Sequence, residues 1–334
     1  MSERREPARP ADLPSGTLDL AAHYLAEASQ QLRRLTRARL PSDPDWVRHQ
    51  VMLPLDVDET WPHSTPPRPI GTGAVHADLI DDDAEALDHL IDTTGPDPEQ
   101  VASDAQQLRL PVTPYRTDPH PVFDIVPDDL TVLRRRTIRK LRILDLTSLW
   151  AGPLATALLA AAGTEVIKID AAIRPDGFHD RPELFRALNA GKIVRDLDLR
   201  DIDDRDQFEK LVADCDLVID SFSRRVMGNL GYSPDELRQI KGDIATLSIT
   251  AFPGHVPERD WVSYGPGIHA VSGLGMASGE PLPPPVAYPD PLTGIRAFGV
   301  ALGLLGRTDE RPHVELSLLG SVAPLVEQLR GGAP

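Results

Sequence analysis

The sequence predicts an α/β protein built on a doubly wound, mostly parallel sheet. Residues 141–170 read as one complete unit of strand, helix and strand. After this unit, short apolar runs rich in β-forming residues alternate with segments of helical periodicity. Because crossover helices join neighbouring parallel strands, this alternation is typical of a sheet with helices on both of its faces.

The first strand–helix–strand unit shows its boundaries in the sequence. Residues 142–146 are a short apolar strand, and Pro153 stands in the first turn of the helix that follows, where a missing N–H leaves no partner unsatisfied. The Ala/Leu-rich helix ends at Gly163, a residue typical of helix C-termini, and 165–170 is the next strand. Parallel sheets bind ligands at the carboxyl ends of their strands, so we expect a site at the loop 147–152.

The later elements of the main domain continue the alternation. Ser233-Pro234-Asp235-Glu236 has the form of a capping box with proline at the first helical position, and it predicts a helix start. After Pro253 the chain becomes rich in glycine and proline, then resumes with regular elements. The remaining expectations are strands at 193–199, 216–221, 244–250 and 313–316, a helix near 291–305 and a last helix ending at Leu329.

The sequence before the main domain predicts a smaller, atypical N-terminal domain. We expect a disordered tail over 1–15, a helical and irregular domain over 16–138, and the main domain over 139–330. Apolar residues at helical spacing predict a helix over 18–40, whereas the proline-rich stretch 41–75 reads as irregular. The other expected elements are helices at 78–93 and 98–108 and a short strand at 110–114.

The composition excludes several classes of protein. The chain has 334 residues, of which 26% are charged, and its formal net charge is −16. This charge argues against nucleic acid or an anionic membrane surface as a partner, although a helix N-terminus can still bind a phosphate. Cys215 stands alone and the histidines are scattered, so we expect neither a disulfide nor a metal site. No signal peptide and no apolar run of membrane-spanning length are found, and we expect a cytoplasmic protein.

A series of short motifs in the main domain resembles one enzyme family. The segment DLTSLWAGP, followed by a helix and by GTEVIKID, is similar to the opening of the class III CoA-transferases (CaiB/BaiF group). That family includes formyl-CoA and carnitine CoA-transferases and α-methylacyl-CoA racemases. The resemblance covers about 140–320 and implies a Rossmann-like domain, an acyl-CoA thioester as substrate and a homodimer. The later motifs, in order, are LNAGK with LDL, DLVIDSF, LGY, LSITAF, SGL, PDPLTG and HVELSLL.

The resemblance places a glycine where the family has its catalytic aspartate. In the family this aspartate attacks the acyl-CoA thioester and forms a mixed anhydride, after which CoA exchanges through an enzyme-bound thioester. Counting back from Ser272-Gly273-Leu274, the corresponding position is Gly265, in the step Ser263-Tyr264-Gly265. Glycine has no side chain that could act as a nucleophile.

Several interpretations of Gly265 stay open. Another carboxylate could substitute, with Asp260, Glu258 and Asp290 as candidates, although Asp290 could also cap the helix that follows it. A partner chain could supply the nucleophile. The protein could also bind CoA without covalent chemistry. For racemase chemistry, His255 and His269 lie in the region of the family's base, but neither fits its G-H-D motif.

The resemblance also implies CoA contacts at the ends of the strands. The loop with Trp150, Ala151 and Gly152 heads the first helix, where free backbone amides favour a phosphate. Basic and polar residues at matching positions of the later motifs are Arg174, Lys192, Ser221, Arg224 and Arg225.

The order of the motifs raises the hypothesis of a rearranged member of the family. Residues 1–138 precede the Rossmann-like part, and the segment QVASDAQQLRLPVTPY faintly resembles a piece of the domain that follows it in the family. A circular permutation is therefore one hypothesis. The functional alternatives are an active CoA-transferase-like enzyme, a catalytically silent homologue that binds CoA or supports a partner, and an enzyme of specialised metabolism that uses the fold without CoA.

Overall fold

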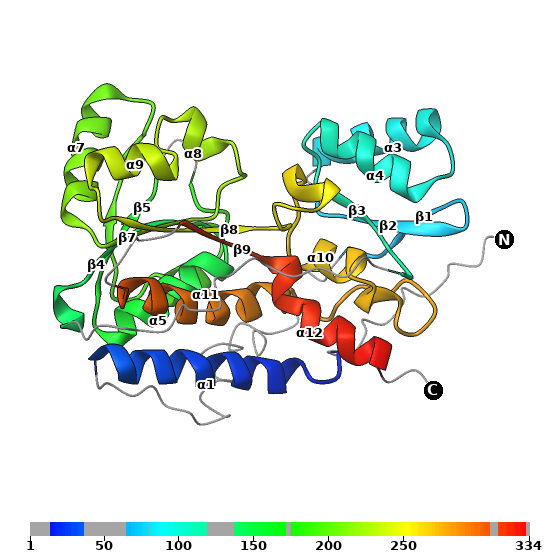
Figure 1. Ribbon diagram of the computed structural model, residues 1–334. Helices are drawn as coiled ribbons and strands as arrows, with labels where there is room; N and C mark the ends of the chain where they lie inside the picture. The colour runs from blue at the N-terminus through cyan, green and yellow to red at the C-terminus, as the bar shows by residue number, and fades with distance from the viewer. Residues whose placement is uncertain are drawn as a thin grey trace.

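The computed structural model describes residues 14–36, 65–79, 81–118, 137–171, 175–307 and 313–331. Its ribbon has two lobes (Figure 1). The larger lobe contains a six-stranded sheet, and the smaller lobe a three-stranded antiparallel sheet with two helices above it. The α/β fold with a parallel main sheet is therefore as the sequence predicted.

The main sheet has the doubly wound strand order. Its strands follow one another in space as β6-β5-β4-β7-β8-β9, and every neighbouring pair is parallel. The direction of winding reverses between β4 and β7, which makes the carboxyl ends of these two strands the expected place of a ligand crevice. The strands are β4 (Arg142–Leu146), β5 (Glu165–Ile169), β6 (Ile193–Arg195), β7 (Leu217–Asp220), β8 (Ala245–Thr250) and β9 (His313–Ser317).

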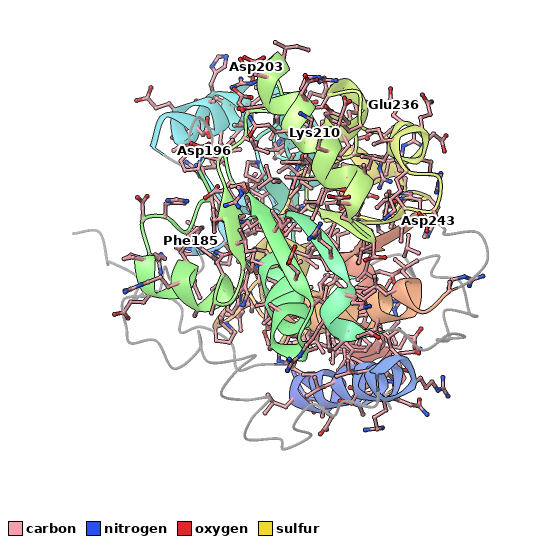
Figure 2. The ribbon with its side chains drawn as sticks, turned by 90° about the vertical axis from the view of Figure 1, so that its left-hand side faces the viewer. Phe185, Asp196, Asp203, Lys210, Glu236 and Asp243 are labelled. Carbon is pink, nitrogen blue, oxygen red and sulfur yellow. The ribbon has the colours of Figure 1, made fainter. Side chains whose placement is uncertain are left out.

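Helices cover both faces of this sheet. In Figure 1, α7 (Ile202–Asp214), α8 (Val226–Asn229) and α9 (Pro234–Ile240) lie above it, and α5 (Ala151–Ala162) and α11 (Pro289–Leu305) lie below. Figure 2 shows the outside of the lobe, where Asp203 and Lys210 on α7 face away from the sheet. Further helices of the described residues are α6 (Pro182–Leu188), α10 (Gly265–Val271), α12 (Leu318–Gly331) and the 3₁₀ turns η3 (Ile138–Lys140), η4 (Pro257–Asp260) and η5 (Leu274–Met276). Of these, α10 lies under the small sheet in Figure 1 and packs against its strands β2 (Gly73–Ala77) and β3 (Val112–Pro114).

Local signals set the ends of these helices as predicted. Gly163 takes the left-handed conformation, with φ 104°, at the end of α5. Ser233 and Glu236 form the capping box that begins α9. Strand β6 is shorter than the expected 193–199, because its neighbour β5 ends at Ile169, which pairs with Arg195, and no strand lies beside the residues that follow.

Helix α1 (Thr17–Thr36) lies at the bottom of the larger lobe in Figure 1 and packs against α11. Its apolar stripe includes Leu25, Leu32 and Leu35, and these side chains join the same buried cluster as the main sheet. Helix α1 therefore shares its core with the larger lobe. Of the predicted helix 18–40, residues 37–40 lie outside the described residues, as do 1–13 of the predicted tail.

The smaller lobe has a core of its own. It is built from β1 (Arg68–Ile70), β2 (Gly73–Ala77), α3 (Asp81–Thr94), α4 (Pro98–Gln107) and β3 (Val112–Pro114). Its buried side chains include Val75, Leu87 and Val101. The expected helices and strand at 78–114 are confirmed. The domain boundaries and the circular permutation stay predictions.

The interpretation of 41–75 as irregular is wrong at its end, where β1 and β2 form a hairpin; residues 41–64 lie outside the described residues. Pro69 in β1 hid the strand signal, but β1 is the edge strand and tolerates a residue without an N–H. Gly71, with φ 55°, supplies the turn that closes the hairpin. Within the described residues, no helix combines the length and apolar composition that a membrane crossing needs.

Candidate functional site

A cavity of about 910 Å³ lies at the carboxyl ends of the main sheet's strands. The predicted loop after β4 forms part of its wall, together with loops after β5, β6, β7 and β8. The smaller lobe contributes Arg109. The cavity thus occupies the crevice that the strand order predicts. Its main wall segments are 146–149, 151–152, 169–171, 175–177, 197–200, 221–224, 249–251 and 259–264.

A buried ion pair fixes the loop after β4 from behind. Lys192 Nζ lies 2.9 Å from Asp145 Oδ2, and both side chains are 0% exposed. Asp145 also accepts hydrogen bonds from the Thr147 N–H (2.9 Å) and hydroxyl (2.5 Å). Burial opposes ionisation, but the charges of Lys192 and Lys168 and the hydroxyl donors lower the pKa of Asp145 overall. The pair is therefore charged and holds Thr147 in place.

A second buried pair holds the same loop from the side. Lys168 Nζ lies 3.3 Å from Asp176 Oδ2 and donates to the Thr147 carbonyl at 2.6 Å. Asp176 accepts the Leu149 N–H at 3.1 Å. Leu149 has φ 65°, a left-handed conformation that a leucine rarely adopts. The surrounding charges therefore impose the loop's shape before any ligand arrives.

The predicted CoA residues near this loop differ in where their side chains lie. Ala151 and Gly152 are in the wall, at the first turn of α5. Gly152 has no room for a side chain, because a Cβ there would lie 2.2 Å from the Thr147 Cβ. Trp150 is buried in the main core, 2% exposed, and the Lys192 ammonium is enclosed behind the loop. Neither lines the cavity.

Of the predicted residues after β7, two line the cavity and one does not. Ser221 and Arg224 are in the wall. The Ser221 hydroxyl accepts the Ser148 N–H at 3.0 Å, and Arg224 pairs with Glu315. The Arg225 side chain is 76% exposed, lies outside the wall and pairs with Asp260 at 3.4 Å. Arg174 lies outside the described residues.

Most of the candidate acids and bases have structural partners or lie away from the cavity. Asp260 is in the wall and pairs with Arg225 and with Arg259 (3.7 Å). Glu258 is buried and pairs with Arg116 at 2.7 Å. His255 is exposed and outside the wall.

His269 is buried in α10, where its Nδ1 lies 2.9 Å from the Tyr288 hydroxyl. Burial lowers the pKa of His269 to about 4, so the ring is neutral at pH 7. His269 does not line the cavity. Neither histidine thus lines the cavity.

Asp290 is the candidate carboxylate that is both buried and in the cavity wall. Its residue is 8% exposed and lies in the first turn of α11. Burial raises the pKa of Asp290 to about 7, and the charge of Asp78 adds to this, whereas the N–H groups of Gly265 and of Asp290 itself lower it. The N-cap of α11 is Tyr288, so Asp290 is not the N-cap residue itself, although its carboxylate accepts its own N–H in the first turn.

Asp290 occupies the space that a side chain at position 265 would need. A Cβ built on Gly265 would lie 2.1 Å from Asp290 Oδ2 and 2.9 Å from the Ala287 Cβ. Oδ2 has no hydrogen-bond partner among the described residues. The glycine and the buried carboxylate are therefore sterically coupled, and the cavity retains one desolvated carboxylate at this point.

A doubly wound parallel sheet with a crevice at its switch point is the arrangement in which open α/β sheets bind their ligands. Residues 138–330 match the model of CoA-transferase family III, and the chain belongs to this family. The acetyl-CoA:oxalate CoA-transferase of Acetobacter aceti is 30% identical over 205 residues, 57% of this chain and 53% of that protein. The succinyl-CoA:glutarate CoA-transferase of Mus musculus is 28% identical over 212 residues, 58% and 48% of the two chains.

The similarity to solved structures covers a comparable share of the chain. A crystal structure of a hypothetical protein from Mycobacterium tuberculosis is 26% identical, with a TM-score of 0.54 over 57% of this chain and 58% of that one. The chain spans about half the length of the curated relatives it matches.

The sequence did not predict the other arginines of the wall. Arg109, Arg200 and Arg259 all line the cavity. Arg200 directly follows the LDL motif, a position that could have signalled it. Arg109 follows a helix of the smaller lobe, and no motif marks it.

Replacing Gly265 with alanine is expected to destabilise the fold by about 1–3 kcal/mol, because the added Cβ overlaps the Asp290 carboxylate. Urea unfolding measures this free energy. The control is Gly228→Ala, since nothing lies within 4 Å of a Cβ there. Adding Asp290→Ala to Gly265→Ala should recover part of the loss. A Gly265→Ala variant as stable as the wild type would contradict the coupling.

Proposed function

We propose that this chain is a CoA-transferase in which Asp290 carries the acyl group. The observation that supports this most directly is the position of the Asp290 carboxylate, which fills the space beside Gly265 in the cavity wall. The family's nucleophile position is empty of side chain, but a carboxylate still stands next to it. Burial keeps this carboxylate desolvated, which suits a nucleophile that must attack a neutral thioester.

The proposed reaction passes the acyl group and CoA through Asp290 in four exchanges. A carboxylate oxygen of Asp290 attacks the thioester carbonyl and the C–S bond breaks. CoA departs as the thiolate, and the acyl group remains on Asp290 as a mixed anhydride. The thiolate attacks the aspartyl carbonyl, which releases the first acid and leaves an enzyme–CoA thioester. The acceptor carboxylate then attacks this thioester, the C–S bond breaks, and CoA thiolate departs as a second anhydride forms on Asp290. The thiolate takes the new acyl group and restores the carboxylate, so no net proton or electron is consumed.

The walls of the cavity support an acyl-CoA in this role. The first turn of α5, with Ala151 and Gly152, directs backbone N–H groups at the cavity and suits a phosphate. Ser221 and Arg224 stand across the crevice. We propose Lys192 as a positioning residue, since its ammonium holds Asp145 rather than facing the cavity. We propose that the ion pair of Arg225 and Asp260 lies at the rim of the cavity.

We propose a small dicarboxylic acid as the acceptor. The two relatives reported above are named for transfer to oxalate and to glutarate, both dicarboxylates. A cavity wall with several arginines suits the free carboxylate of such an acid. A homodimer, which the resemblance implies, and a cytoplasmic location, which the sequence analysis expects, stay predictions.

A catalytically silent CoA-binding homologue is the second candidate, because Gly265 removes the family's nucleophile. One experiment separates the two functions. The purified chain is incubated with acetyl-, formyl- or succinyl-CoA and with oxalate or glutarate, and exchange is followed by chromatography. Hydroxylamine added with the acyl-CoA should trap the anhydride as a hydroxamate on the peptide that contains Asp290, detected by mass spectrometry. Binding of CoA without exchange or labelling would support the silent homologue.

Transfer activity is expected to rise with pH through about 7, because Asp290 attacks only when ionised and its pKa is about 7. Stability should change in the opposite direction. An unfolded aspartate ionises near pH 3.9, so between about pH 4 and 7 the folded chain holds the extra proton, and the free energy of unfolding falls as the pH rises. The measurements are kcat/KM against pH and urea unfolding against pH. Asp290→Asn should lose this contribution to the stability slope; an unchanged slope would contradict the assignment.

A further inference from the structure

Two non-glycine residues with a left-handed backbone line the same cavity. Among the described residues, positive φ outside glycine occurs at Leu149 (65°) and Arg109 (64°). Both are in the cavity wall, although they come from different lobes. Such strain persists where the surroundings impose it, and it concentrates at functional sites. Arg109 therefore stands out as a position held for its side chain.

The strain at Arg109 arises where the chain leaves α4. Leu108 is the C-cap of this helix, and the next residue takes the left-handed conformation that usually selects glycine or asparagine. The Arg109 N–H bonds to the Gln106 carbonyl and the Leu110 N–H to the Ala105 carbonyl, each at 3.0 Å. These bonds fix the turn and direct the arginine toward the larger lobe.

The Arg109 guanidinium spans two loops of the larger lobe. Nη1 donates to the Asp260 carbonyl and Nη2 to the Ser223 hydroxyl, both at 3.0 Å. A guanidinium has five N–H donors, so these two bonds leave three others available to a ligand.

Other contacts already attach the smaller lobe at this point. The Gln106 side chain donates to the Val262 carbonyl at 2.8 Å and accepts the Val262 N–H at 2.7 Å. Arg116 pairs with Glu258 at 2.7 Å. The two lobes are thus joined without Arg109, and glycine would fit its backbone better.

Arg109 differs from the other arginines of the wall in its charge balance. Arg200 pairs with Asp198, Arg224 with Glu315 and Arg259 with Asp260. Within the described part of the chain, Arg109 has no carboxylate partner, and both oxygens that it contacts are neutral. Its positive charge therefore lies at the cavity, and no acid of the described residues forms an ion pair with it.

We infer that Arg109 binds an anionic oxygen group of the ligand, either a carboxylate of the acceptor acid or a phosphate of CoA. This inference rests on the proposed function for the nature of the ligand. It adds a specificity-determining residue that the smaller lobe contributes to a site otherwise formed by the family domain. On this inference, an arginine is retained at position 109 despite its strained backbone because its guanidinium binds the ligand.

The test separates the charge of Arg109 from its backbone. Arg109→Gly relieves the strained conformation and removes the cation, whereas Arg109→Lys keeps the charge. Calorimetric titrations use CoA, the uncharged fragment pantetheine, succinate and its neutral analogue succinamide. The control is Arg186→Gln, which removes one positive charge from an exposed arginine outside the wall.

Arg109→Gly is expected to fold at least as stably as the wild type and to lose about 10- to 100-fold in affinity for the anion it binds, as for one charge-assisted hydrogen bond. Loss for CoA alone identifies a phosphate, and loss for succinate alone a carboxylate; Arg109→Lys should recover part of either. Equal loss for pantetheine or succinamide, or no loss at all, overturns the inference. A wild type that binds none of the four probes overturns the proposed function as well.

Discussion

Replacing Asp290 with asparagine is expected to abolish acyl transfer, by at least about 10³-fold in kcat, while CoA still binds. An amide has nearly the size of the carboxylate and fills the same space beside Gly265, but it cannot form the anhydride. The variant should fold normally, because the substitution removes a desolvated charge with little change in shape. Hydroxylamine labelling of the Asp290 peptide should disappear with the activity.

The other candidate acids provide matched controls for this result. Asp260→Asn removes a carboxylate of the same size from the same wall, and its ion pairs with Arg225 and Arg259 are partly exposed. We expect its activity to stay within a few-fold of wild type, since surface pairs contribute little. Loss of activity in Asp260→Asn with retention in Asp290→Asn would reverse the assignment of the nucleophile.

The fold could be predicted from sequence because its strands carry strong local signals. The strand 142–146 and the helix ending at Gly163 were expected where they occur, since buried parallel strands are continuous apolar runs and helix ends have characteristic residues. The hairpin at 68–77 was missed because its local sequence signal points away from a strand. Proline indicates irregular chain in a sequence, and only the sheet shows that Pro69 lies on an edge where it is tolerated.

The candidate site could be predicted only in part. The loop 147–152 was expected from topology, and Ser221 from the family motifs, and both line the cavity. Arg109 could not be found, because it contacts Ser223 and Asp260 from more than a hundred positions away in the sequence. A distance of this kind has no periodicity or spacing to reveal it.

Asp290 shows the limit most clearly. Its motif is the same whether the carboxylate caps a helix or faces a ligand, and the sequence left both roles open. Asp290 Oδ2 occupies the volume that a side chain at position 265 would fill, and this favours a role in facing a ligand. A departure from a family motif is therefore best interpreted together with the residue that occupies the vacated volume.

Replacing Lys192 with methionine is expected to destabilise the fold by about 3–5 kcal/mol, because it leaves the Asp145 carboxylate buried without its partner. Hydrogen bonds from Thr147 and Thr156 would remain, but they are neutral donors. Urea unfolding measures the loss. The control is Lys210→Met on the outer face of α7 (Figure 2), where the expected change is within about 0.5 kcal/mol.

The same variant separates two roles that the motif N-x-G-K leaves undecided. If Lys192 contacted CoA, as the resemblance implies, Lys192→Met would lose affinity but keep its stability. If its ammonium instead fixes Asp145 and the loop after β4, the free energy of unfolding falls. The CoA affinity of the folded variant then decreases only to the extent that the loop changes its position. The 0% exposure of both side chains favours the second outcome, because a charge enclosed behind Thr147 cannot reach a ligand without opening the loop.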